Sequence, residues 1–527
     1  MGGSSGELRI GLTISGAIAL GAYDGGALAA LLCAAQAVNE RKPGALRIDA
    51  MAGASAGSIT VLLAARTLLR GLDPIDAMYR AWVVTPQLDR VSDGSVSPLS
   101  EERGRTEAKS LLGAKENLER AQSAPIRVNL ALGCLRGLDY SIARIGGPPV
   151  SASTYLDWGE WTVEQSHDLS WYLAPSGPVD TALASGAHPA AFPPYGLDRS
   201  DPAVLAGYEA NKIQDFPKSN YLWYTDGGTI DNEPLGRTLD LTQDIDAAAD
   251  DPLDAAARLH LLITPDPARP GSRDDAWSTV HPPPTWAKTG LRTIKLVRQQ
   301  RLYDDLRRVE KTNSRIEWVR VLERELLAII RGERNDAEAA LTNVAETITH
   351  QRDHLDDPED FREDLPTGPD SPLDRALRRA LDAATGFSKK RDVAVAVVSP
   401  LLLPEIVDGS TVPHDLLAGE FLGHFGGFLD ERLRENDFAL GYRSMIGWLG
   451  GQAGLAQQGL EPELSEVALA GAEASRDGWS RKSGRTWVQG LGKESFKSLP
   501  FRTQLKLYKV ALRSAWIAFN QIRKQGA

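Results

Sequence analysis

One serine between two glycines, placed where an apolar run gives way to a helix-forming run, constrains this chain most. A short, mostly apolar run (47–52) precedes the pentapeptide Gly-Ala-Ser-Ala-Gly, and a run rich in leucine and alanine (58–69) follows it. This order predicts a buried strand, a sharp turn and a helix, which together form a nucleophile elbow. The turn strains Ser55, and side chains at Gly53 or Gly57 would clash where strand and helix approach closely. Ser55 is therefore predicted to stand exposed above a sheet edge.

Composition indicates a soluble globular protein of two to four domains, because 527 residues with 42% apolar content can build large cores. The net charge of −11 argues against nucleic acid as the main partner. Asp24 and several glycines interrupt the longest apolar run (10–38), so no membrane span is expected. Residues 1–6 lack a secretory signal, and Cys33 and Cys134 lie in apolar segments, which together indicate a cytosolic setting. No metal-ligand spacing is visible, so neither metal nor cofactor is expected.

A loop of small residues follows the first predicted strand (8–14) and leads into a helix. The loop contains Gly16, Ala17 and Ile18, whose backbone N–H groups are candidate donors to an anion or oxyanion. An ordinary tight turn is the alternative interpretation of the same residues.

A second candidate site residue ends a short aromatic strand (221–224). Asp226 is followed by Gly227 and Gly228, which let the backbone fold away, so the aspartate has the position of a catalytic carboxylate at a strand end. A structural Asp-Gly turn is the alternative. Between the serine and this aspartate lies a proline-punctuated loop (184–194) with the sequence Ala-Ser-Gly-Ala-His-Pro-Ala-Ala-Phe-Pro-Pro.

These motifs together resemble the patatin-like phospholipases. The loop after strand one, the Gly-x-Ser-x-Gly turn, the Ala-Ser-x-Ala-x-Pro-x-x-Phe-Pro-Pro loop and the Asp-Gly-Gly turn occur in family order within about the first 270 residues. The resemblance implies a three-layer α/β/α fold and a Ser-Asp dyad, with Ser55 as nucleophile and Asp226 as its partner. The chain departs from the family where Ala17, Ile18 and Leu20 replace glycines and a basic residue. Backbone amides survive these replacements, but the positive charge does not.

The implied activity is that of a lipid acyl hydrolase of phospholipase A or lysophospholipase type. Asp226 would accept the proton of Ser55, although a carboxylate with an ordinary pKa of about 3.9 is a weak base for an alcohol. A dry apolar pocket raises the pKa of a carboxylate, and oxyanion donors stabilise the tetrahedral intermediate. Alternatives are a Ser-Asp-His triad using His260, an acyltransferase or triacylglycerol lipase with the same dyad, and a non-catalytic or weakly active scaffold that binds a partner protein.

The chain beyond the resemblance is predicted to be largely helical. The catalytic α/β domain is assigned to 1–275, a charged helical insertion of two or three helices with an acidic linker to 276–390, and the C-terminal region to 391–527. A β-branched run (392–398) predicts a strand that returns to the sheet. The segment 416–440, which is rich in phenylalanine and charged residues, is interpreted as structural.

The C-terminal tail is strongly basic. From Arg481 onward it contains eleven Lys or Arg residues and one acid, Glu494. From Phe501 to Ile522, apolar residues recur at helical spacing with basic residues on their flank. A terminal helix packed on its own domain is one interpretation. The other is an interfacial helix that docks the enzyme on an anionic membrane surface.

Overall fold

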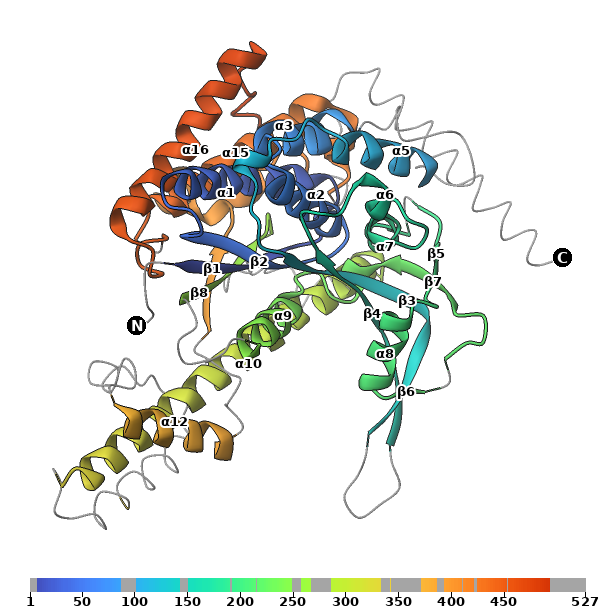
Figure 1. Ribbon diagram of the computed structural model, residues 1–527. Coiled ribbons are helices and arrows are strands. Elements are labelled where there is room, and N and C mark those ends of the chain that lie inside the picture. Colours follow the sequence, from blue (N-terminus) through green and yellow to red (C-terminus); the bar gives the residue numbers. More distant parts are fainter. Residues whose placement is uncertain are drawn as a thin grey trace.

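The protein is a mixed α/β structure in which helices cover both faces of one curled sheet (Figure 1). The computed structural model describes residues 7–86, 101–142, 150–189, 192–214, 216–248, 257–266, 286–332, 342, 371–385, 393–409, 411–420, 424–452 and 454–492. Of the predicted acidic linker (353–374), residues 353–370 lie outside the described residues and the last four lead into helix Pro372–Thr385, while the basic tail from Phe501 to Ile522 lies wholly outside them.

The sheet has nine strands in the described ranges, and its central path runs β5-β7-β3-β2-β1-β8-β9. β3, β2, β1, β8 and β9 are parallel neighbours, whereas β7 and β5 continue the sheet antiparallel, and β4 and β6 pair with β3. The strands are β1 (Leu8–Ile14), β2 (Leu46–Gly53), β3 (Ile126–Ile142), β4 (Val150–Val163), β5 (Tyr195–Asp198), β6 (Ile213–Gln214), β7 (Tyr221–Asp226), β8 (Ala257–Ile263) and β9 (Ala394–Val398).

Helices form a layer on each side of this sheet, with α1, α2 and α15 above it and α9 and α10 below it in Figure 1. The longer helices are α1 (Gly21–Arg41), α2 (Ala56–Arg70), α3 (Pro74–Tyr79), α5 (Glu101–Leu112), α7 (Pro178–Ser185), α8 (Pro202–Ala210), α9 (Leu235–Ala247), α10 (Trp286–Ile330), α12 (Pro372–Thr385), α15 (Glu431–Leu449) and α16 (Pro462–Ser483). Short helical turns are η1 (Ile18–Leu20), η2 (Arg80–Val84), η4 (Gly227–Thr229), η9 (Gly426–Leu429), α6 (Leu169–Tyr172), α13 (Pro404–Val407) and α14 (Pro413–Leu416).

The centre of the sheet is buried on both faces. β1 reads Leu-Arg-Ile-Gly-Leu-Thr-Ile and all but one of its residues are buried, as expected for a parallel strand between two helical layers. α1 packs above it and is buried almost all round. The segment Ile18–Arg41 is long and apolar enough to cross a membrane, and it is the one such helix in the described part of the chain. Its apolar window is 94% buried inside the protein, as in a core helix.

The C-terminal helices belong to the same hydrophobic core as the first strands. α15 lies against α1 so closely that a Cβ at Gly26 would be 1.9 Å from the carbonyl oxygen of Phe438. A Cβ at Gly441 would likewise be 1.9 Å from the carbonyl oxygen of Tyr23. Only glycine permits this approach. Residues of α15 and α16 therefore help to fix α1, the helix that follows the loop at 16–21.

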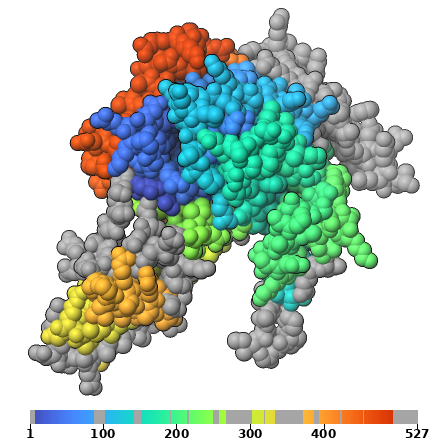
Figure 2. Space-filling model, in the orientation of Figure 1, coloured from blue at the N-terminus to red at the C-terminus, as the bar shows by residue number. Residues whose placement is uncertain are grey.

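The segment between β8 and β9 includes a projecting helical arm. β9 pairs in parallel with β8, so the strand expected at 392–398 does join the sheet. Before it, α10 and α12 lie together and project from the body (Figure 2). α10 alone accounts for 45 residues of the run in which two or three helices were predicted, and most of the remainder of that run lies outside the described residues. α10 contains no proline and no glycine after Gly290, so nothing interrupts it.

Candidate active site

The predicted strand, turn and helix around Ser55 are confirmed. β2 ends at Gly53, α2 begins at Ala56, and Ser55 lies between them with φ 52° and ψ −124°. This conformation is sparsely populated by residues with a side chain and persists only where the surroundings hold it. A Cβ at Gly53 would lie 2.5 Å from the carbonyl oxygen of Gly57, and a Cβ at Gly57 would lie 2.4 Å from that of Ile14. The two glycines are thus required by close backbone contacts.

Ser55 and Asp226 meet at one end of the sheet. β3 lies between β2 and β7, and it pairs with Gly53 through Leu130 and with Asp226 through Leu132. The Oγ of Ser55 donates a hydrogen bond of 3.1 Å to Oδ2 of Asp226. Both residues are buried, with exposed fractions of 5% and 1%, so the prediction that Ser55 stands exposed was wrong. A hydroxyl thus lies within proton-transfer distance of a buried carboxylate.

The turn after β7 holds the Asp226 carboxylate in place. The N–H of Gly228 donates to its other oxygen, Oδ1, at 2.8 Å, and the N–H of Asp226 itself donates to the carbonyl of Ala187 at 3.0 Å. A Cβ at Gly227 would lie 2.0 Å from the carbonyl oxygen of Ala131, so the chain folds tightly against β3. With Oδ1 bound to a backbone amide, Oδ2 remains directed to the serine.

The loop after β1 lies beside the serine, but its three candidate amides differ. A Cβ at Gly16 would be 3.1 Å from Cβ of Ser55, whereas the Gly16 N–H donates to the carbonyl of Asn232 at 2.9 Å. The Gly16 N–H, one of the three candidate oxyanion donors, is therefore already bound to the protein. Within the described residues, the N–H groups of Ala17 and Ile18 have no hydrogen-bond acceptor in the protein. These two amides remain candidates for oxyanion donors. The first N–H of α2, at Ala56, likewise has no hydrogen-bond acceptor within the described residues.

Ile18 combines a backbone conformation that favours glycine with a β-branched side chain. Its φ is 52°, in the left-handed region, which is a genuine outlier for isoleucine. Its side chain lines the cavity that also contains Ser55. An isoleucine at this position therefore narrows the space beside the serine as well as straining the loop.

The serine lies on the wall of an apolar cavity of about 200 Å³. The cavity extends between α2, η2, α5 and α7, and its wall is made of aliphatic and aromatic side chains with few polar groups. Its lining residues are Ile18, Ser55, Ala56, Ile59, Leu62, Leu63, Ala81, Trp82, Thr85, Pro86, Gly104, Glu107, Ala108, Leu111, Leu112, Val179, Ala182, Leu183, Gly186, His188, Phe192, Phe425 and Phe428. This composition fits the hydrocarbon part of a ligand.

The C-terminal segment supplies part of this wall, which the structural interpretation of 416–440 did not anticipate. Phe425 and Phe428 line the cavity. Arg434, fully buried in α15, donates to the carbonyl of Gly427 at 2.7 Å and to that of Val83 at 2.8 Å. One guanidinium thus joins η9 to η2 on two sides of the cavity. The phenylalanines were visible in the sequence, but only the packing of α15 on α1 brings them to the serine.

His188 is a second residue whose place was missed. It lies in the proline-punctuated loop, lines the cavity that contains Ser55, and packs edge-on against Phe425 with ring centroids 5.3 Å apart. The carbonyl of its neighbour Ala187 accepts a hydrogen bond from the Asp226 N–H. The Ala-Ser-x-Ala-x-Pro motif drew attention to this loop. His188 occupies the second variable position of the motif, so nothing in the sequence indicated a site residue there.

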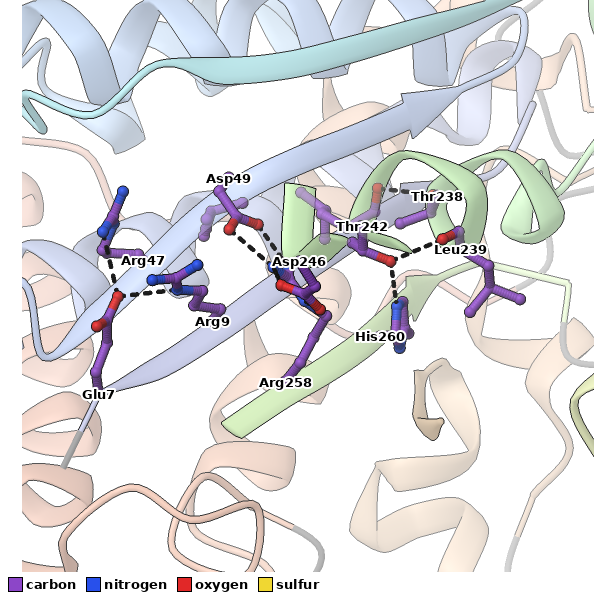
Figure 3. A network of polar contacts seen from close by, with 12 residues as sticks. Glu7, Arg9, Arg47, Asp49, Thr238, Leu239, Thr242, Asp246, Arg258 and His260 are labelled. Atoms are coloured by element: carbon purple, nitrogen blue, oxygen red, sulfur yellow. Dashed lines mark hydrogen bonds and ion pairs between the residues drawn. The ribbon is translucent and has the colours of Figure 1, made fainter. Parts of the chain in front are cut away.

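His260, the candidate for a triad, lies in β8 within a separate polar network (Figure 3). Its Nε2 is 2.9 Å from Oγ1 of Thr242, and its Nδ1 is 3.3 Å from the carbonyl of Ala394. Burial, aided by the positive charge of Arg258, lowers its pKa to about 4. Its neighbour Arg258 is held by Asp49 and Asp246. Both ring nitrogens of His260 face groups other than Ser55, so it is a core histidine.

Metal and sequence comparisons add no further site. No group of three or more His, Cys, Asp or Glu side chains in the described residues is arranged to hold a metal ion. No protein-family model matches the chain, and no curated protein matches it.

Proposed function

We propose that the chain is a lipid acyl hydrolase of patatin type that cleaves carboxylic esters through a Ser55-Asp226 dyad. One observation carries the proposal: Oγ of Ser55 donates to Oδ2 of Asp226 at 3.1 Å, and the serine lies on the wall of an apolar cavity. The order of the four motifs and the α/β sheet with its nucleophile elbow support a patatin-like fold.

The reaction assigns one role to each group. Ser55 Oγ attacks the ester carbonyl while its proton passes to Asp226, and the carbonyl oxygen gains negative charge that the N–H groups of Ala17, Ile18 and Ala56 stabilise. Collapse of this intermediate breaks the bond to the alcohol, which takes the proton from Asp226. Water then attacks the acyl-serine and gives its proton to Asp226. The bond between Ser55 Oγ and the acyl carbon breaks, Oγ takes the proton back from Asp226, and the fatty acid leaves.

The cavity argues for substrates with a long acyl chain. Each buried methylene contributes about 0.8 kcal/mol, so a chain that enters the cavity gains affinity with length until the space is full. Phospholipids, lysolipids and acylglycerols share such chains. Acyl transfer to an alcohol proceeds through the same acyl-serine, so an acyltransferase activity is a second outcome of this site.

His188 is the rival base, because it lines the same cavity as Ser55. The hydrogen bond that Ser55 donates goes to Asp226, and a serine hydroxyl has one proton to donate. Asp226 is therefore assigned as the base. If His188→Gln hydrolyses esters and Asp226→Asn does not, this assignment is supported. If Asp226→Asn hydrolyses esters and His188→Gln does not, the base is His188.

A fluorophosphonate probe tests the proposal against a non-catalytic scaffold. Such probes react with activated serines, so the wild type is expected to be labelled and Ser55→Ala to remain unlabelled. Ser444→Ala is the matched control, because this buried serine in α15 donates to Leu440 at 3.0 Å. A wild type that neither reacts with the probe nor hydrolyses long-chain esters would favour the scaffold, whose partner surface would then have to be sought elsewhere.

A further inference from the structure

Ser185, the last residue of α7, contacts the backbone of the candidate nucleophile. Its Oγ accepts the N–H of Ser55 at 3.0 Å and lies 2.7 Å from Oγ of Ser58. Ser58 Oγ donates to the carbonyl of Gly53 at 2.8 Å. Ser58 and Ser185 are fully buried, so water does not compete for these contacts.

The donors and acceptors allow only one direction for this chain of hydrogen bonds. Each hydroxyl has one proton. Because Ser58 gives its proton to Gly53, its oxygen accepts from Ser185, and the Ser185 oxygen accepts from the Ser55 N–H. This series of hydrogen bonds runs from the N–H of Ser55 to the carbonyl of Gly53. It therefore holds both ends of the two peptide units that precede the strained serine.

This arrangement explains what holds Ser55 in an unfavourable conformation. Within the described residues, no backbone carbonyl accepts the Ser55 N–H, and a buried N–H without a partner would favour another conformation. Ser185 supplies that partner from a different element. It also removes the Ser55 N–H from the set of oxyanion donors, which leaves the other amides for that task.

We propose that Ser185 is a positioning residue that, with Ser58 behind it, fixes the backbone of Ser55 so that Oγ faces both Asp226 and the ester carbonyl. The kinetic consequence rests on the proposed function, whereas the backbone consequence does not. Ser185 touches neither the substrate nor the proton that moves, so its effect is on the geometry of Ser55.

The kinetic test compares Ser185→Ala with Ser444→Ala, which removes another fully buried hydroxyl far from the elbow in sequence. Ser185→Ala is expected to lower kcat for a long-chain ester and the rate of fluorophosphonate labelling about tenfold, as for loss of one buried hydrogen bond. KM should stay within about twofold, because the cavity wall is unchanged. Ser444→Ala should keep the wild-type rates per folded molecule.

Two further variants separate positioning from general destabilisation. Ser185→Cys keeps the side-chain volume with a weaker hydrogen-bonding group, and it should lose rate in the same direction. Adding Ser58→Ala to Ser185→Ala should lower kcat by less than about twofold more, because Ser58 acts on Ser55 through Ser185. Wild-type kcat in both Ser185 variants, or multiplicative losses in the double variant, would overturn the proposal.

Hydrogen exchange provides a readout that needs no activity. The amide of Ser55 should exchange at least about tenfold faster in Ser185→Ala than in the wild type, measured by mass spectrometry on a peptide spanning 53–58. Ser444→Ala should leave this peptide unchanged. Equal exchange in wild type and Ser185→Ala would refute the positioning role, whether or not Ser55 is a nucleophile. Faster exchange in Ser185→Ala, together with a wild type that cleaves no ester, would instead reject only the proposed function.

Discussion

His260 gives a pH prediction that bears directly on the choice between a dyad and a triad. The ring is 4% exposed, and burial lowers its pKa from about 6.5 in the unfolded chain to about 4 in the fold. The unfolded state therefore binds a proton at a higher pH than the folded state does. Stability from the neutral ring is fully present above pH 6.5 and is lost as the pH falls toward 4.

The size of the effect follows from the two pKa values. A difference of about 2.5 pKa units corresponds to about 3 kcal/mol of unfolding free energy, which is lost in full once the pH is below both pKa values. About 2 kcal/mol of it should already be lost between pH 7.5 and pH 5, because the unfolded histidine is then almost fully protonated while the folded one is not.

Urea unfolding at a series of pH values measures this loss, and His260→Gln is the control because its amide can still reach Thr242 without titrating. The difference in unfolding free energy between wild type and variant should change by about 2 kcal/mol from pH 7.5 to pH 5. A constant difference would refute the buried neutral histidine. His260→Gln should also retain ester hydrolysis at pH 8 per folded molecule, and loss of hydrolysis there would restore the triad.

Asp226→Asn should lower kcat at least about 100-fold with little change in Tm, since it removes the base but keeps a similar shape; retention of more than about a tenth of the rate would place the base elsewhere. Ala108→Leu, which fills the cavity from α5, should lower kcat/KM for a sixteen-carbon ester about tenfold and spare a four-carbon ester, whereas Ser110→Leu on the exposed side of α5 should do neither. EDTA should leave the rate unchanged, and loss that calcium reverses at the chemical step would contradict the dyad mechanism. Deleting residues 497–527 should weaken binding to anionic vesicles but spare a short soluble ester; equal binding would return the tail to a structural role.

Local patterns in the sequence predicted the elements that hold the site. The strand at 8–14 has the bounds of β1, and the elbow pattern placed Ser55 between a strand and a helix because its glycines are required by contacts within a few residues. The order of the motifs, which resembles that of a known family, predicted that Asp226 lies at the same site. The elbow depends on short-range contacts that the sequence records directly, whereas the pairing of Asp226 with Ser55 was implied by the family resemblance.

Features that depend on long-range packing were not predictable. Phe425 and Phe428 reach the cavity only because α15 packs on α1 and Arg434 binds Gly427, contacts that no local pattern encodes. The engagement of the Gly16 amide by Asn232 is similar, since two loops far apart in sequence meet there.

The most direct test of the central claim is to identify the acylated residue. The wild type is mixed with a long-chain p-nitrophenyl ester, quenched in acid within the first turnovers, digested and analysed by mass spectrometry. The account predicts one acyl group on the peptide that contains Ser55, and none in Ser55→Ala or Asp226→Asn. Acylation of another residue, or hydrolysis at the wild-type rate by Ser55→Ala, would contradict it.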